Sequence, residues 1–172
     1  MLFRSKSLVD FAKAMNVPGA SYTQNLRAFN EAQGVFRESG ESGEKATEAA
    51  KWSAPMLVKI EQASAGLDDE GKSKMHRQAL DMLRFIEDSG GLQSKERFNA
   101  LANAGFKAIM SSGGNVDWSQ YRQFKSISGV SGMFINDESL FASLEPIIGL
   151  MKGSAAGTGL RTAYGRLNGS VR

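Results

Sequence analysis

Hydrophobic positions recur along the chain at intervals of three and four residues, the spacing that places side chains on one face of an α-helix. One such face follows Ser21 and consists of Leu26, Phe29, Ala32, Val35 and Phe36. Few segments show the alternation of β-branched and polar residues that is typical of strands. The pattern predicts an all-α fold, an irregular multi-helix domain of six to eight helices.

Glycine-rich breaks and capping residues divide these helical stretches. Ser94 and Asp117 each precede an apolar face and can accept a hydrogen bond from an amide of the first turn. The expected helices cover residues 8–15, 21–38, 44–65, 72–88, 95–110, 118–127, a stretch from a cap at residue 136 or 137 to 151, and 155–167. The unequal spacing of the breaks argues against a repeat protein.

Two prolines lie inside the predicted helices. Pro55 removes an amide donor and clashes with the preceding turn, so we expect a kink, or two helices with the second beginning near Ser53 or Ala54. Pro146 is expected to be an internal irregularity in its helix.

The helical faces also predict the core and the domain organisation. Residues 1–20 are expected to form an N-terminal arm or short helix, and residues 21–172 a single helical domain. The predicted core residues are Phe98, Leu101, Phe106, Phe141, Leu144 and Ile148.

Composition fits a globular protein, with 41% hydrophobic and 23% charged residues. The absence of cysteine excludes disulfides and thiolate metal sites. The net charge of +3 is unevenly placed, because residues 152–172 hold four basic side chains and no acid, which leaves −1 for the rest of the chain (+3 less 4). A nucleic-acid-binding surface more often spreads its basic residues, so nucleic acid is not the expected partner.

Candidate chemistry is sparse. His76 is the single histidine and has neither an evident second metal ligand nor a cysteine to activate, so we interpret it as a surface or half-buried helical residue. The adjacent carboxylates in the connectors lack the spacing of a calcium loop or of an acid–base pair. We therefore expect no catalytic residue, no cofactor, no metal site and no enzymatic activity.

The segment GSAAGTG (residues 153–159) has two readings. Phosphate-binding loops use glycine for close backbone approach, but this segment lacks the lysine and hydroxyl residue of a P-loop, and no strand precedes it. Its small residues favour instead a helix that packs closely against its neighbour.

A family resemblance covers most of the chain. The segment DWSQYRQFKSISGVSGMFINDESLFASLEPIIGLMKGSAAGTGLRTAYGRLNGSVR (residues 117–172) resembles the central domain of phage tail tape-measure proteins, of the type found in contractile-tailed temperate phages and prophages. NLRAFNEAQGVF (residues 25–36) and MLRFIEDSGGLQSKERFNALAN (residues 82–103) are similar to the family more loosely. Tape-measure proteins are usually several times longer, so the resemblance implies an excised domain or a fragment of a longer protein.

The resemblance implies a structural protein that takes part in tail assembly and sets tail length as a ruler inside the growing tube. Implied partners are the tail tube and tail assembly proteins, and the implied location is the virion tail, or the host cytoplasm during assembly. No small-molecule substrate is expected. An alternative is a small helical nucleic-acid-binding module that uses the basic C-terminal helix. A cell-wall hydrolase would need an acid pair or a metal cluster, and we find neither in the sequence.

The C-terminal segment is the predicted assembly surface. Leu160, Tyr164 and Leu167 lie at helical spacing and are expected to dock inward, while the arginines face solvent or another chain. We expect self-association through residues 153–172. The candidate assembly residues are Arg161, Tyr164, Arg166 and Arg172.

Overall fold

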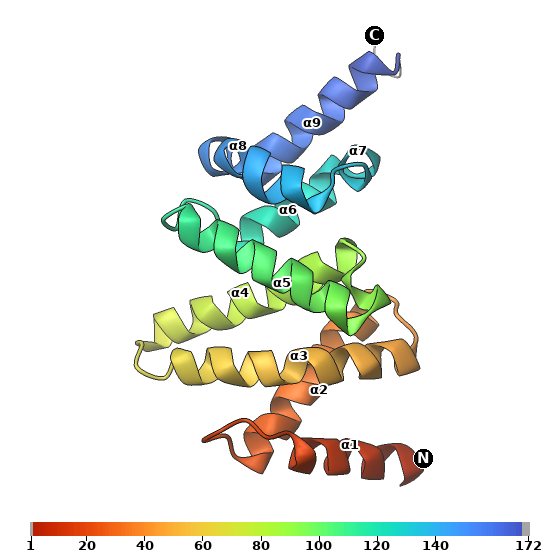
Figure 1. Cartoon of the computed structure of the whole chain (residues 1–172), viewed down its shortest axis with the longest axis vertical. Helices are drawn as coiled ribbons and strands as arrows, with labels where there is room; N and C mark the ends of the chain where they lie inside the picture. Colours follow the sequence, from red (N-terminus) through yellow and green to blue (C-terminus); the bar gives the residue numbers. More distant parts are fainter. Residues whose placement is uncertain (1, 170–172) are drawn as a thin grey trace. The chain divides into compact units, whose positions relative to one another are not determined.

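The computed structural model describes residues 2–169, and side chains from Leu8 onward (Figure 1). It confirms the all-α prediction: 80% of the structure is helical, the described residues contain no strand, and eight of the helices have seven residues or more. The helices are α1 (Leu2–Ala14), α2 (Tyr22–Glu38), α3 (Gly43–Ala63), α4 (Asp69–Asp88), α5 (Lys95–Ser111), α6 (Trp118–Ser128), α7 (Val130–Met133), α8 (Glu145–Met151) and α9 (Gly153–Leu167), with a 3-10 turn at Gly91–Gln93 and a π-helical turn at Ser139–Ser143.

The chain divides into two compact units, Met1–Leu83 and Arg84–Arg172. The division falls within α4, so each unit contains part of that helix. Two compact units can belong to one domain, and the expectation of a single domain over residues 21–172 stays a prediction.

The first unit is built on the pairing of α2 with α3. Ser21 caps α2 reciprocally: its hydroxyl accepts from the Gln24 amide at 3.2 Å, and its own amide donates to Gln24 Oε1 at 2.9 Å. The buried Asn25 donates from Nδ2 to the carbonyl oxygens of Ala12 and Met15, at 3.1 and 3.0 Å. These bonds fasten the end of α1 to α2, so α1 is a packed helix that begins earlier than the predicted 8–15.

Of the two outcomes expected at Pro55, a kink or a second helix, helix α3 contradicts the second helix. A single helix runs from Gly43 to Ala63 with Pro55 inside it, and neither a break nor a second start occurs near Ser53. Ser53 is fully buried and donates its hydroxyl proton back to the carbonyl oxygen of Ala49 at 2.9 Å. Packing along α2 buries one face of α3 on both sides of the proline. That tertiary packing outweighs the local cost of a missing amide donor.

The second unit is organised around a cluster of aromatic side chains. Phe85 on α4 lies 5.7 Å from the ring of Trp118, 5.9 Å from Tyr121 and 5.7 Å from Phe141, measured between ring centroids. Phe85 and Tyr121 are fully buried, and Trp118 nearly so. Burial, with a smaller effect from the charge of Glu145, raises the pKa of the Tyr121 phenol. Such offset ring contacts add to the stabilisation from burial.

The predicted caps of this unit are confirmed. Ser94 Oγ accepts from the Arg97 amide at 3.1 Å, and Asp117 Oδ1 accepts from the Gln120 amide at 2.9 Å. Asn136 Oδ1 accepts from the Ser139 amide at 2.8 Å, but the helix that follows is not continuous. Instead the π-helical turn precedes α8, and Pro146 lies in the first turn of α8, where a proline costs little.

The predicted core is correct in part. Phe98, Leu101 and Ile148 are fully buried, whereas Phe141 and Leu144 are half-buried. The prediction for Phe106 is wrong, because 38% of its surface is exposed. Gly105 takes the core-facing position beside it, and Phe106 meets only the edge of Trp118, at a centroid distance of 5.6 Å.

Candidate functional site

The first unit contains a groove of about 530 Å³ that opens between α2, α3 and the first part of α4. Its floor is apolar and includes Ala28, Leu57 and Ile60. Its rim is charged and includes Arg27, Glu31, Glu61, Lys72 and His76. The volume falls in the range of small-ligand sites, so the rim chemistry decides whether it is one.

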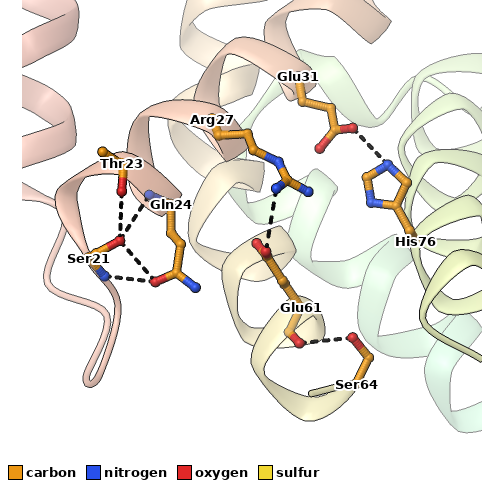
Figure 2. Close-up of polar contacts among 8 residues, drawn as sticks. All are labelled: Ser21, Thr23, Gln24, Arg27, Glu31, Glu61, Ser64 and His76. Carbon is orange, nitrogen blue, oxygen red and sulfur yellow. Dashed lines mark hydrogen bonds and ion pairs between the residues drawn. The ribbon is translucent and has the colours of Figure 1, made fainter. Parts of the chain in front are cut away.

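Four of the five rim charges form two pairs, and Lys72 pairs instead with Asp69 outside the groove (Figure 2). His76 Nε2 lies 2.8 Å from Glu31 Oε1, and Arg27 Nη1 lies 3.8 Å from Glu61 Oε1. Figure 2 shows these pairs linking α2 to α4 and α2 to α3. The His76 contact is an ion pair only when the imidazole is protonated. Because acid and base compensate each other here, the groove favours neither an anion nor a cation.

His76 is half-exposed, as the sequence predicted, with 43% of its side-chain surface accessible. The sequence did not reveal Glu31 as its partner. The two residues lie on different helices, and their meeting depends on how α4 lies beside α2. We interpret the pair as a surface contact of small energetic weight.

A second polar cluster lies in the second unit, around a cavity of about 280 Å³. The Arg97 guanidinium forms a two-pronged contact with the Asp137 carboxylate, in which Nη2 donates to Oδ1 at 2.9 Å. Lys125 Nζ donates to the carbonyl oxygen of Gly132 at 3.0 Å. Burial lowers the pKa of Lys125, and the nearby charges of Asp137 and Asp88 offset part of that effect. These contacts fasten α5 and α6 to the 132–137 segment, which is a structural role.

No group of three or more histidine, cysteine or acidic residues in residues 2–169 is arranged to hold a metal ion. Among the helices that the structure describes, none combines the length and the apolar character that a bilayer span requires.

The small residues of GSAAGTG pack inside the unit, as predicted. Gly153, Ala156 and Gly157 are buried against α6. A Cβ atom added at Gly153 would lie 2.0 Å from the carbonyl oxygen of Gln120, and one added at Gly157 would lie 2.9 Å from that of Phe124. The glycines therefore allow two helix backbones to approach closely, and their face of α9 is already covered.

The inward docking predicted for the rest of α9 is wrong. Leu167 is 88% exposed and Tyr164 38% exposed, while Leu160 is half-buried. The second half of α9 extends past the other helices of its unit (Figure 1). Helix α7, which contacts α9, is a single short turn of four residues.

The four candidate assembly residues have different positions. Tyr164 stacks on Phe134, with ring centroids 6.1 Å apart and planes inclined by 16°. Arg161 and Arg166 are exposed on α9, but they are five positions apart along the helix, so they point in different directions. Arg172 lies outside the described residues.

Sequence reasoning missed the neighbours of Tyr164. Phe134 and Met133 are each 74% exposed and Val130 is 61% exposed. The only local signal was a run of apolar residues directly after the Gly129–Gly132 break, where the preceding helix has already ended. An apolar run in so short an element cannot bury all its members.

Comparison with protein-family models, with curated proteins and with solved structures found no match to the chain. The tape-measure resemblance is therefore a hypothesis that rests on the residues quoted above.

Proposed function

We propose that the chain is a structural segment of a phage tail tape-measure protein and acts in tail assembly and tail-length determination. The observation that carries this proposal is the resemblance of residues 117–172 to the central domain of that family. Two structural features support it. The fold is all-α, and most of its strongly exposed large apolar side chains lie in the same region of the chain, namely Val130, Met133, Phe134, Leu150 and Leu167, with Met110 on α5 as the exception. An assembly protein needs such partner-binding surface and no reaction centre.

Tail length in the phage or prophage that encodes the chain tests the proposal. An in-frame deletion of residues 21–66 removes α2 and α3. If each helical residue contributes about 1.5 Å to the ruler, these 46 residues correspond to roughly 70 Å of tail. Electron microscopy should therefore show shorter tails for the deletion and longer tails for a tandem duplication of the same residues.

The control replaces residues 21–66 with an unrelated helical sequence of equal length. A ruler responds to the number of residues, so the replacement should restore tail length. Complete tails of unchanged length in both the deletion and the duplication would refute the proposal.

The alternative, a nucleic-acid-binding module, has one observation in its favour. Arg161 and Arg166 are exposed, and no acid lies between Lys152 and Arg172. Four basic residues can neutralise at most about four phosphates, so binding should be weak and should fall steeply as salt rises. A salt titration of the purified chain on double-stranded DNA tests this alternative, and salt-insensitive binding or none would exclude it.

A further inference from the structure

The α7–α9 surface, referred to below as the strip, is defined as the exposed apolar residues Val130, Met133 and Phe134, on or directly after α7, and Tyr164 and Leu167 on α9. Val130 and Phe134 are one helical turn apart, as are Tyr164 and Leu167, so each pair shares a face. The Phe134–Tyr164 stack joins the two pairs. Four of the five residues are 61–88% exposed, and Tyr164 is 38% exposed.

The exposure of this strip does not result from poor packing of α9 as a whole. Another part of α9 packs closely on α6 through Gly153, Ala156 and Gly157, which are buried. Exposed large apolar side chains that adjoin one another, rather than lying scattered, mark interaction surfaces. Tyr164 and Leu167 are aligned along α9 with the half-buried Leu160, a spacing that matches the apolar stripe of a second helix laid alongside.

The charges beside the strip restrict the kind of partner. Arg161 is one turn before Tyr164 and flanks the strip, and α9 contains no acid. Residues 129–135, which include α7, carry no charge. A second copy of the chain offers no acid from its α9 or from residues 129–135 to pair with Arg161, so a partner that supplies acidic side chains complements the strip better.

We infer that the α7–α9 surface binds an amphipathic helix of another protein, whose apolar face is flanked by acidic side chains. The apolar face would cover Phe134, Tyr164 and Leu167, and a flanking carboxylate would pair with Arg161. This inference deepens the proposed function and rests on it, because it names the chemistry of an assembly partner.

The test measures binding of fluorescent helical peptides to the purified full chain. One peptide carries leucines at positions i, i+3, i+4 and i+7 with glutamates on both flanks, and its matched control has lysine in place of every glutamate. The acidic peptide should bind about tenfold or more tightly than the basic one, and the difference should shrink as salt rises. Equal affinity of the two peptides, or no binding of either, would overturn the inference.

Matched variants locate the binding surface. Phe134→Ala and Leu167→Ala should each weaken binding of the acidic peptide by about fivefold or more, because they remove contact residues. Leu150→Ala, which truncates an equally exposed side chain on α8, should leave affinity unchanged. Arg161→Glu should weaken binding more than Arg166→Glu, which makes the same charge change on another face of α9. All five side chains are exposed, so helical circular dichroism should stay the same.

Other occupants give different results. Sedimentation that shows self-association, lost in both Phe134→Ala and Leu167→Ala, would assign the surface to a second copy and overturn the inference. Binding to anionic lipid vesicles or to DNA without binding to the acidic peptide would also overturn it. The outcome is separable from tail length: unchanged tails with selective peptide binding refute only the proposed function, and altered tails without peptide binding refute only this inference.

Discussion

At the scale of single residues, Gly105 is one of the tightly packed glycines of the second unit. A Cβ atom there would lie 2.0 Å from the outer edge of the Trp118 ring. Trp118 cannot move away easily, because Phe85, Phe106 and Tyr121 surround its ring. Gly105→Ala should therefore lower the free energy of unfolding by about 1–3 kcal/mol, as overpacking of a core does. Chemical denaturation measures this value.

The control for that variant is Gly159→Ala on α9, where an added Cβ atom meets nothing within 4 Å. Alanine is the better helix former, so this change should raise the free energy of unfolding by about 0.5–1 kcal/mol. If the two variants shifted stability in the same direction, the close contact between Gly105 and Trp118 would be wrong.

The same position shows what residue patterns predict and where they fail. Helical spacing correctly placed Phe98 and Leu101 in the core, because hydrophobic periodicity follows directly from burial of one helix face. The same spacing wrongly placed Phe106 in the core. From sequence alone the large apolar Phe106 is favoured as a core residue over its neighbour Gly105, but Gly105 is the one that faces the core. In the folded unit the Trp118 ring fills the space at Gly105. The position of Trp118 against Gly105 depends on tertiary packing, and the residues around Gly105 do not specify it.

At the scale of helices, Pro55 provides the clearest test. Its ring nitrogen cannot donate to the carbonyl of Lys51, four residues earlier, so one bond of α3 is missing. Pro55→Ala should restore that bond and raise the free energy of unfolding by about 1–3 kcal/mol. Pro146→Ala is the control: that proline lies in the first turn of α8, where the amide has no helical partner, so its effect should stay within about 1 kcal/mol.

A loss of stability in Pro55→Ala would mean that the packing of α3 on α2 depends on the proline. Both variants are measured by thermal and denaturant unfolding.

Helix features that depend on residues close in sequence could be predicted, whereas those that depend on distant residues could not. The caps at Ser21, Ser94 and Asp117 form between residues three apart, so the motif itself specifies them. The unbroken course of α3 depends on packing against α2. The Phe134–Tyr164 stack joins α9 to the end of α7, and no local motif predicts it. The predicted assembly residues therefore include Tyr164 of the α7–α9 surface but none of its residues near α7, and their role in assembly stays a prediction.

At the scale of the whole molecule, the division of the chain predicts which fragments fold. The aromatic cluster of the second unit includes Phe85, and Ile86 beside it is also fully buried. A fragment of residues 67–172 keeps both, together with the start of α4, where Asp68 Oδ1 accepts from the Gly71 amide at 2.8 Å. A fragment of residues 89–172 lacks both side chains, and each loss of this kind costs about 2–5 kcal/mol. That total is comparable to the full stability of a small domain.

The longer fragment should therefore unfold cooperatively on heating, with dispersed methyl and aromatic resonances in its NMR spectrum. The shorter fragment should show neither, although it retains every residue from α5 to α9. Phe85→Ala in the longer fragment tests whether the missing Phe85 side chain explains the difference between the fragments. It should lower the melting temperature without removing any backbone. Cooperative unfolding of residues 89–172 at a melting temperature equal to that of residues 67–172 would mean that the second unit does not need α4. The packing of Phe85 against Trp118, Tyr121 and Phe141 would then contribute little to its stability.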